Sequence, residues 1–553
     1  MAARSARAGG LPAGVCVTAS HNPAPDNGFK LVDPPHGHGL DPAWEGAADA
    51  LAGLDSPEAV GAAAGTLLMG GTVTPGGAVV PAPQEAVNEA APHAVLLLGR
   101  DTRPSSPALS AAVAAGAAAL APPPALALFD LGITTTPRLH WAVARACESL
   151  QTGAPLDPDA WSVGAYAREL AAGHACLVAG TRPIAWDASP APTLAVDCAH
   201  GVGAAQLEAL AAATAPAGLR LAAFNHPPPP GDGVGGGHAL NKDCGSEHVQ
   251  KTRSPPKAWV PGEAAESPSP PPPGALCAAL DGDADRVVFF TNNSEGGEGC
   301  QLFDGDRIAL LLAAWLAPLI AALPPYPETN SKPSVGVVQT AYANGAAAAA
   351  AAKALGGAAG VALAATGVKH LHATAEARFD AGIYFEANGH GAVLLSARLK
   401  GHAARLAADA GAPATARAAG RAVVALGAAC NQAVGCALSG LLLVDAALRC
   451  LGWGAGDWAG MYEDLPSVMS VVKVKDRSVI RTTPDEGTVL EPPRLQAALD
   501  AAAAGAGPGA RTFVRPSGTE DVVRVYAEAG SVAGAKALAA EAEAAVQAWA
   551  GGV

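Results

Sequence analysis

The sequence predicts a multi-domain α/β protein, built from three related α/β domains and a smaller C-terminal α+β domain. The chain has 553 residues, which exceeds the size of one hydrophobic core and predicts roughly three to five globular units. Short apolar runs, glycine-punctuated loops and alanine-rich helical stretches recur in that order, as is typical of strands joined by crossover helices. Residues 453–553 depart from this order, because two strand-like runs there precede one long helical stretch.

Four strand-like runs each end in a polar loop and mark the predicted α/β blocks. They cover residues 15–17, 94–98, 194–196 and 335–338. The C-terminal unit has predicted strands at 471–474 and 522–526 and a predicted helix at 533–549. The longest apolar run, residues 308–323, is shorter than the ~20 residues of a membrane-spanning helix and contains Pro318. It therefore predicts a core helix.

Three segments have compositions that disfavour a packed core. They are residues 47–92, the proline-rich stretch 254–273 and the alanine- and glycine-biased stretch 403–427. We expect all three to be surface insertions. The proline-rich stretch predicts a passive linker, with recognition by a polyproline-binding partner as the alternative.

Composition limits the classes of partner and the cellular compartment. The formal net charge of −14 disfavours nucleic acid as a partner, because phosphate-backbone binding needs a clustered positive field. No membrane partner is expected either. The ten cysteines include no C-x-x-C pair, which favours free thiols in a reducing compartment over zinc or disulfide frameworks. We expect a cytoplasmic protein, with an organellar address as the alternative because residues 1–7 have a transit-peptide composition.

The first candidate motif is the segment 18–30, which follows the predicted strand 15–17. Ser20, presented on a tight loop at a strand end, is a competent nucleophile if a base or a cation lies beside it. His21 and Lys30 are the candidates for that role. The alternative is an Asx-type turn in which serine and asparagine satisfy backbone groups.

The second motif is the acidic stretch 281–286, after the apolar run 275–280. Asp281, Asp283 and Asp285 alternate with the two smallest residues and can turn onto one hard cation such as Mg²⁺. An EF-hand is excluded, since Arg286 and Asn292 stand where that loop needs glycine and glutamate. The alternative is a solvated acidic turn, but three like charges this close repel unless a positive group neutralises them.

The third motif is the glycine-rich loop 385–391. Glu386 and Asn388 can accept from and donate to vicinal hydroxyls, and His390 can exchange a proton. A histidine between glycines is also common in ordinary turns.

The fourth motif, residues 515–520 with Arg524 on the next predicted strand, concentrates hydrogen-bond donors. Two guanidinium groups, two hydroxyls and the amides of a glycine turn suit a phosphate dianion. A salt-bridged structural loop is the alternative. Taken together, the four motifs supply a phosphate carrier, a divalent metal, a polyol grip and a second phosphate clamp, which is the set that one phosphate-relocating reaction on a sugar needs.

These motifs resemble the phosphohexomutase superfamily, and within it the phosphoacetylglucosamine mutases. The resemblance covers residues 18–30, 99–106, 134–137, 196–198, 339–345, 366–372, 385–391, 431–435 and 513–528. The sugar loop distinguishes the subfamily. Phosphoglucomutases typically have Glu-Glu-Ser or Glu-x-Ser there, whereas Glu386-Ala387-Asn388-Gly389-His390 is similar to the N-acetylglucosamine form.

The resemblance implies four domains around a central cleft. The expected bounds are 1–165 for a phosphoserine-loop domain, 166–299 for a metal-loop domain, 300–452 for a sugar-loop domain and 453–553 for a mobile phosphate-binding domain. Relatives usually have a longer segment before the serine loop, with a first strand and an arginine that points into the site. The first domain is therefore expected to lack its first strand, either because the chain is incomplete at its start or because the domain is built without it.

The resemblance also implies the reaction. N-acetylglucosamine 6-phosphate would take phosphate from phosphorylated Ser20, form the 1,6-bisphosphate, reorient, and return the 6-phosphate to Ser20. N-acetylglucosamine 1-phosphate would remain, for UDP-N-acetylglucosamine synthesis. Traces of sugar 1,6-bisphosphate would act as activator. The alternatives are a phosphoglucomutase or phosphomannomutase, or a sugar-phosphate binder without turnover. Monomer and homodimer both remain open.

The resemblance implies these site residues. One Mg²⁺ per chain would be held by Ser20, Asp281, Asp283 and Asp285. The catalytic residues would be Ser20, His21, Lys30 and His390, of which Lys30 and His390 match positions that help to shuttle protons in relatives. The substrate-binding residues would be Glu386, Ala387, Asn388, Arg515, Pro516, Ser517, Gly518, Thr519 and Arg524.

Overall fold

The computed structural model places the chain in two compact units. The first comprises residues 1–302 and 428–445, and the second comprises residues 303–427 and 446–553. Within them, the structure describes residues 5, 10–22, 25–52, 72–73, 79–80, 94–120, 126–186, 192–227, 240–259, 271–292, 299–517 and 520–550.

The first sheet of the first unit is mixed, and its strands lie in the order β3-β2-β1-β6-β7. β1 runs parallel to β6, and β6 parallel to β7, while β2 returns antiparallel beside β1. Its strands are β1 (Ala13–Val17), β2 (Phe29–Asp33), β3 (His38–Gly39), β6 (Ala94–Arg100) and β7 (Leu126–Ile133). The helices of this region are α2 (Pro42–Ala52), α4 (Ser106–Leu120), α5 (Thr136–Gln151) and α6 (Val163–Leu177), and β4 (Thr72–Val73) pairs with β5 (Val79–Val80).

The second sheet has the order β12-β11-β10-β8-β9. β8 is parallel to β9 and β10, and β11 is antiparallel to β10. Its strands are β8 (Leu194–Asp197), β9 (Leu221–Phe224), β10 (Leu276–Leu280), β11 (Val287–Thr291) and β12 (Leu302–Phe303). α7 (Gly203–Thr214) and α8 (Gly245–Thr252) belong to the same region. Because β10 is buried along its whole length, the acidic loop that follows starts from a fixed strand end.

The third sheet lies in the second unit, in the order β14-β13-β15-β16. Its strands are β13 (Val335–Thr340), β14 (Val361–Ala364), β15 (Ala381–Phe385) and β16 (Gly391–Leu395). The helices of this part of the chain are α9 (Gly305–Ala321), α10 (Gly345–Ala354), α11 (Val368–Arg378), α12 (Ala397–Ala408), α13 (Ala414–Ala429), α14 (Ala437–Leu451) and α15 (Ala455–Ala459). The predicted core helix at 308–323 is confirmed as α9, which is buried over most of its length.

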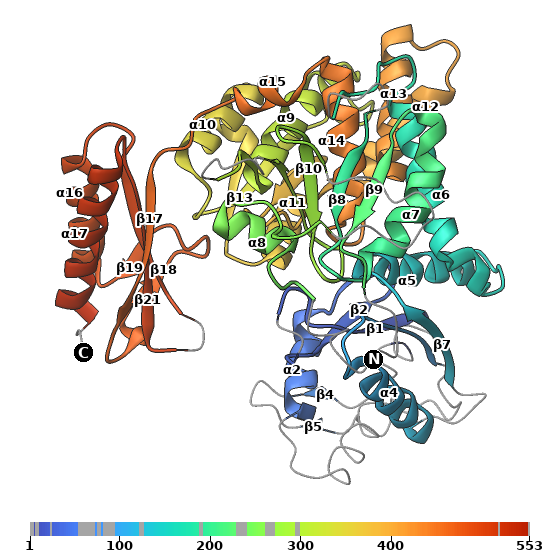
Figure 1. Ribbon diagram of the computed structural model, residues 1–553, viewed down its shortest axis with the longest axis horizontal. Coiled ribbons are helices and arrows are strands. Elements are labelled where there is room, and N and C mark those ends of the chain that lie inside the picture. The colour runs from blue at the N-terminus through green and yellow to red at the C-terminus, as the bar shows by residue number, and fades with distance from the viewer. Residues whose placement is uncertain are drawn as a thin grey trace. The chain divides into compact units, whose positions relative to one another are not determined.

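The C-terminal part is an antiparallel three-stranded sheet with two helices packed on one face (Figure 1). The sheet consists of β17 (Ser467–Lys473), β21 (Val522–Glu528) and β20 (Arg511–Pro516), in that order, and the helices are α16 (Pro493–Gly505) and α17 (Val532–Ala550). A small hairpin, β18 (Arg481–Thr482) and β19 (Val489–Glu491), precedes α16. Val472, Val523 and Leu495 belong to the buried core between sheet and helices.

The predicted α/β organisation with a smaller C-terminal α+β part is confirmed, but one sequence expectation is wrong. Residues 403–427 are not a surface insertion with poor folding prospects, because they lie in α12 and α13 and bury Ala403, Val423 and Leu426. Alanine has the highest helix propensity, and its small side chain lets helices approach closely. A Cβ on Gly420 would lie only 2.7 Å from the carbonyl oxygen of Ala403.

The other two expected insertions, 47–92 and 254–273, lie mostly outside the described residues. Within the part that is described, α2 continues to Ala52 and Trp259 packs edge-on against Phe224. In the part of the chain for which coordinates are described, no helix has the length and apolar character needed to cross a membrane.

Candidate active site and metal centre

Ser20 lies in the turn between β1 and β2, in a backbone conformation that residues other than glycine rarely adopt. Its φ is +54°, in the left-handed region. Its carbonyl oxygen accepts two hydrogen bonds, from Nη2 of Arg103 at 2.9 Å and from Nδ2 of Asn241 at 3.1 Å. Arg103 is fixed in turn by the buried carboxylate of Asp101 at 2.8 Å. These contacts hold a strained turn in one orientation.

The hydroxyl of Ser20 points at the loop that follows β10. Its Oγ lies 2.8 Å from Oδ2 of Asp281 and 2.7 Å from Oδ1 of Asp283. One hydroxyl proton can serve only one of these two oxygens at a time. Gly282, between the two aspartates, leaves no room for a side chain, because a Cβ there would lie 2.9 Å from the Ser20 carbonyl oxygen.

Asp281, Asp283 and Asp285 form a buried cluster whose candidate ligand oxygens all lie within 4.8 Å of one another. The loop curls around Asp281, whose Oδ1 accepts the backbone N–H groups of Asp285 and Arg286 at 3.0 and 3.1 Å. Nζ of Lys30 donates to Asp283 and to Asp285, at 2.6 Å each. The sequence pattern thus correctly indicated that these acids turn toward one point.

With all three acids ionised, the cluster carries more negative than positive charge. Three carboxylates face one ammonium, on Lys30, and the guanidinium of Arg286, whose Nε is 3.7–3.8 Å from two of them. Burial raises the pKa of Asp281 well above its usual range, and the charges of Asp285 and Asp283 raise it further. For Lys30, burial would lower the pKa, but ion pairing with Asp283 and Asp285 outweighs it and raises the pKa overall.

This donor set fits a hard divalent cation. All three acids offer oxygen ligands, the type that Mg²⁺ prefers, and they are crowded at a spacing that a positive ion would relieve. A phosphoryl group on Ser20 Oγ would add further negative charge beside the two carboxylates that this oxygen contacts at 2.8 and 2.7 Å. A phosphorylated Ser20 therefore needs a cation more than the free hydroxyl does.

His21 follows Ser20 directly and is partly buried. Burial lowers its pKa, as does the nearby charge of Arg286, so the neutral imidazole is favoured near neutral pH. Its Nδ1 is buried and has no hydrogen-bond partner among the residues that the structure describes. Nδ1 of this ring, next to the candidate nucleophile, is therefore not used by a hydrogen bond to another described residue.

Three residues that the sequence motifs did not single out belong to this site: Arg103, Thr136 and Asn241. Thr136 Oγ1 donates to Oδ2 of Asp283. Arg103 and Thr136 fall in segments of the family resemblance, 99–106 and 134–137, so that signal was available. Asn241 carried none, because nothing in its local sequence points 221 positions back to Ser20.

In the second unit, residues 386–390 form the tight turn between β15 and β16. The N–H of Glu386 donates to the carbonyl of His390 at 2.9 Å, and Gly389 supplies a φ of +88°. Asn388 ties the turn together, since its Oδ1 accepts from the N–H of His390 at 3.0 Å and its Nδ2 donates to Glu386 Oε2 at 3.3 Å. The carbonyl of Ala387 accepts the N–H of Gly305 at 3.4 Å. Glu386, Asn388 and His390 are therefore brought together on one rigid turn.

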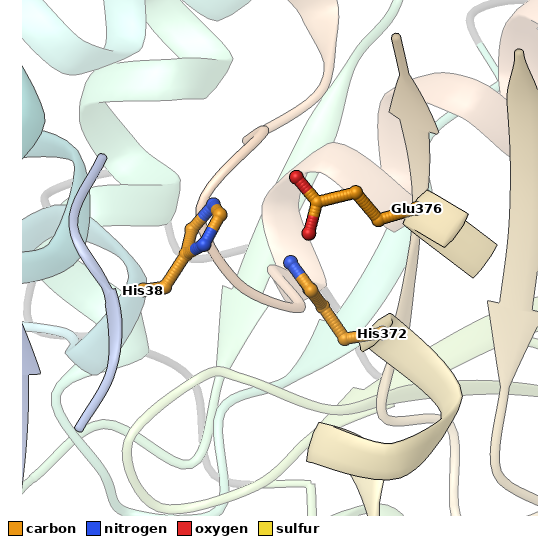
Figure 2. A group of neighbouring side chains, drawn as sticks. All are labelled: His38, His372 and Glu376. Carbon is orange, nitrogen blue, oxygen red and sulfur yellow. The ribbon is translucent and has the colours of Figure 1, made fainter. Parts of the chain in front are cut away.

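The strand that leads into this turn is supported by α11. Figure 2 shows His372 and Glu376 projecting from that helix, four residues apart, and Nδ1 of His372 lies 3.1 Å from the hydroxyl of Tyr384. Tyr384 is the residue before Phe385, the last of β15. The contact holds the strand end from which the sugar loop starts.

The predicted phosphate loop lies on the C-terminal sheet. Arg515 and Arg524 are directly opposite each other on β20 and β21, and Pro516 is opposite Val523. Ser517 is nearly buried, with its N–H donating to Val522 at 2.9 Å, and its Oγ accepts from the N–H of Glu520 at 3.4 Å. Gly518 and Thr519 lie outside the described residues. The two arginines are thus brought to one face of one strand pair.

Three family models match the chain. They are the phosphoglucomutase/phosphomannomutase alpha/beta/alpha domain I at residues 1–47, the phosphoacetylglucosamine mutase AMG1 domain III at 304–453, and the phosphoglucomutase/phosphomannomutase C-terminal domain at 472–545.

Curated relatives match over nearly the whole chain. Phosphoacetylglucosamine mutase of Arabidopsis thaliana is 36% identical over 542 residues, covering 97% of this chain and 89% of the relative. The enzyme of Sus scrofa is 37% identical, covering 98% and 88%.

Solved structures agree. N-acetylphosphoglucosamine mutase of Aspergillus fumigatus, in complex with GlcNAc-6P and magnesium, superposes with a TM-score of 0.80 at 33% identity, covering 99% of this chain and 91% of that one. A complex of a serine-to-alanine variant of that enzyme with glucose 1,6-bisphosphate gives a TM-score of 0.76 at 33% identity and the same coverage.

Proposed function

Because the chain belongs to the phosphoacetylglucosamine mutase family, we propose that it interconverts N-acetylglucosamine 6-phosphate and N-acetylglucosamine 1-phosphate through phosphorylated Ser20 and a 1,6-bisphosphate. The observation that carries the proposal is the placement of the Ser20 hydroxyl within 2.8 Å of two members of a buried aspartate cluster. The product would supply UDP-N-acetylglucosamine synthesis. All ten cysteines lie in the described part of the chain as free thiols, which supports a cytoplasmic location.

Ser20 is the proposed phosphate carrier. In the forward direction the phosphoryl group leaves Ser20 Oγ for the sugar 1-hydroxyl, whose proton passes to a base. The bisphosphate then reorients, and Ser20 Oγ forms a bond to the 6-phosphoryl group while the bond from that phosphorus to the sugar 6-oxygen breaks and the 6-oxygen takes up a proton. The fixed turn keeps Oγ in place through both transfers, which lowers the entropic part of the barrier. His21, Lys30 and His390 are the groups of this chain proposed to hold or move the protons.

Ser20, Asp281, Asp283 and Asp285 are the residues that would hold the divalent cation. When bound, Mg²⁺ would neutralise charge that develops on the transferring phosphoryl oxygens. The Aspergillus fumigatus relative has been solved with magnesium. Lys30 and Thr136 hold Asp283 and Asp285 in place through the contacts described above.

The sugar and the non-reacting phosphate are proposed to contact residues of the second unit. Glu386, Ala387 and Asn388 would recognise the sugar, and the predicted phosphate loop together with Arg524 would bind the phosphate. The residues of that loop are Arg515, Pro516, Ser517, Gly518 and Thr519, of which Gly518 and Thr519 lie outside the described residues. The proposal requires that one substrate molecule contact both sets of residues during turnover.

The decisive experiment follows N-acetylglucosamine 6-phosphate by ³¹P NMR with purified chain, Mg²⁺ and a trace of glucose 1,6-bisphosphate. We expect the 1-phosphate to form, and intact-mass analysis to show one phosphoryl group that S20A does not acquire. A matched reaction with glucose 6-phosphate tests the sugar assignment, and faster turnover of that sugar would contradict it. Binding without any phosphoryl uptake would show a sugar-phosphate binder instead of a mutase.

A further inference from the structure

Glu486 makes a bridge within the second unit that neither the motifs nor the proposed mechanism uses. It sits at the tip of the β18–β19 hairpin, and its Oε1 lies 2.9 Å from Nε of Arg515. Its Oε2 accepts two hydrogen bonds from Thr366, from the backbone N–H at 3.0 Å and from the hydroxyl at 2.6 Å. One carboxylate therefore joins the phosphate-loop arginine to the turn that precedes α11.

The hairpin is built so that Glu486 keeps this position. Its backbone is left-handed, with a φ of +61°, and its N–H donates to the carbonyl of Thr483 at 2.9 Å. Oδ1 of Asp485 accepts the N–H of Gly487 at 3.1 Å and the hydroxyl of Thr483. Glycine would adopt this φ with less strain, so we attribute the presence of a glutamate at this position to the contacts that its side chain makes.

The bridge leaves most of the guanidinium of Arg515 available. The contact recorded with Glu486 is at Nε, whereas the two terminal nitrogens of a guanidinium carry four further N–H donors. The hydroxyl of Tyr342 also interacts with Arg515, so it is a second neighbour of this guanidinium. Those nitrogens suit the oxygens of a phosphate. Because Oε2 is committed to Thr366, Glu486 does not form the two-point pair with Arg515 that a phosphate would have to displace.

The charges of the strand pair point the same way. Arg515 and Arg524 are directly opposite each other, and like charges in that position repel. Glu486 offsets one of them when no phosphate is bound. It thus holds the guanidinium of Arg515 at one position before the dianion arrives.

We propose that Glu486 is a positioning residue that orients Arg515 for the phosphate that is not being transferred and fixes it relative to the Thr366 turn. This inference deepens the proposed function and rests on it. It assigns Glu486 no contact with the reacting atoms.

The test compares E486Q with wild type and with E491Q. Glutamine keeps the shape and an acceptor for Thr366, but cannot pair with Arg515. We expect the KM for N-acetylglucosamine 6-phosphate, and its Kd by calorimetry, to rise about tenfold, because the ion pair at Nε would no longer orient Arg515. kcat should change less than about threefold, because the transferring groups are untouched. Glu491 pairs with Arg481 at 3.1 Å on the same hairpin, exposed, so E491Q should match wild type.

Two results would overturn the inference. A lower KM in E486Q would show that Glu486 competes with the phosphate, and a fall in kcat at unchanged KM and Kd would place its role elsewhere. The Kd readout does not need turnover, so it also separates the two proposals. A wild type that binds and turns over, with E486Q unshifted, refutes only the role of Glu486, whereas a wild type without binding or turnover refutes the mutase proposal and this inference together.

Discussion

Substitution of Gly282 by alanine tests whether the contact between the serine turn and the aspartate loop sets the position of the nucleophile. A Cβ at this position would lie 2.9 Å from the carbonyl oxygen of Ser20, 2.9 Å from Nδ2 of Asn241 and 3.0 Å from a methyl carbon of Leu240. These distances are well inside ordinary van der Waals contact. Two of the three atoms belong to the hydrogen bond that holds the turn, so neither can move without disturbing it.

The expected magnitude follows from how the clash is relieved. Overpacking of this kind typically costs about 1–3 kcal/mol. If the structure held rigid, the cost would appear as lost stability. We expect the turn to shift instead, because two loops meet here, and a shift of about 1 Å at a reacting atom can cost ~10²-fold in rate. G282A should therefore acquire its phosphoryl group about 10- to 100-fold more slowly than wild type.

The assay is the time course of phosphoryl uptake from glucose 1,6-bisphosphate, followed by intact mass, with thermal unfolding measured in parallel. G116A is the matched control, since Gly116 lies in α4 with nothing within 4 Å of an added Cβ. It should take up phosphate at the wild-type rate. A G282A variant that is folded and phosphorylates as fast as wild type would refute the argument that this contact positions Ser20.

Three further substitutions test other parts of the structure. D283N removes a charge that contacts Ser20, and we expect phosphoryl uptake to fall by at least about 100-fold in a folded protein, measured by intact mass; uptake within threefold of wild type would contradict this. D306N tests a buried acid whose pKa is raised to about 8 by burial first and then by neighbouring acids. Because the folded state holds this proton more tightly than the unfolded state, the free energy of unfolding of the wild type should fall as pH rises from about 4 toward 8. In urea unfolding, the free energy of unfolding of D306N should depend less on pH. An equal pH dependence in the two proteins would contradict this. E528Q removes the buried carboxylate that pairs at 2.7 Å with Arg511, whose side chain is 35% exposed. The free energy of unfolding measured in urea should fall by about 1–3 kcal/mol. An unchanged unfolding midpoint would contradict this.

The sequence was sufficient for the parts of the site that follow strand ends. Ser20 comes directly after β1 and the aspartates directly after β10, and short loops from buried strands leave little choice of direction. Alternation of Asp281, Asp283 and Asp285 with small residues predicted that the acids turn together. The family resemblance assigned residues 385–391 to the sugar and residues 515–520 to a phosphate, where the local pattern alone also allowed ordinary turns, and both assignments stay predictions.

Contacts between distant segments were beyond the sequence. Asn241 and Glu486 each act on a partner far along the chain, and each sits in a turn whose composition predicts only a turn. The left-handed backbone of Ser20 was equally hidden, because a serine gives no signal for it. The prediction of a surface insertion at 403–427 was wrong for a different reason. It considered the small apolar area of alanine but not its high helix propensity.

The distribution of charge explains why phosphate transfer and the binding of the second phosphate are assigned to different residues of the chain. With its three acids ionised, the aspartate cluster of the first unit carries more negative than positive charge, so it attracts a cation and repels a phosphate that has none bound. In the second unit, Arg515 and Arg524 lie opposite each other and Glu486 contacts Arg515, so these two arginines together carry more positive charge than this one carboxylate offsets. In the proposed mechanism, Arg515 and Arg524 bind the phosphate that is not transferred. Because that mechanism has the bisphosphate reorient between the two transfers, the arginines have to release this phosphate as well as bind it. A carboxylate that orients Arg515 while offsetting part of its charge would allow both.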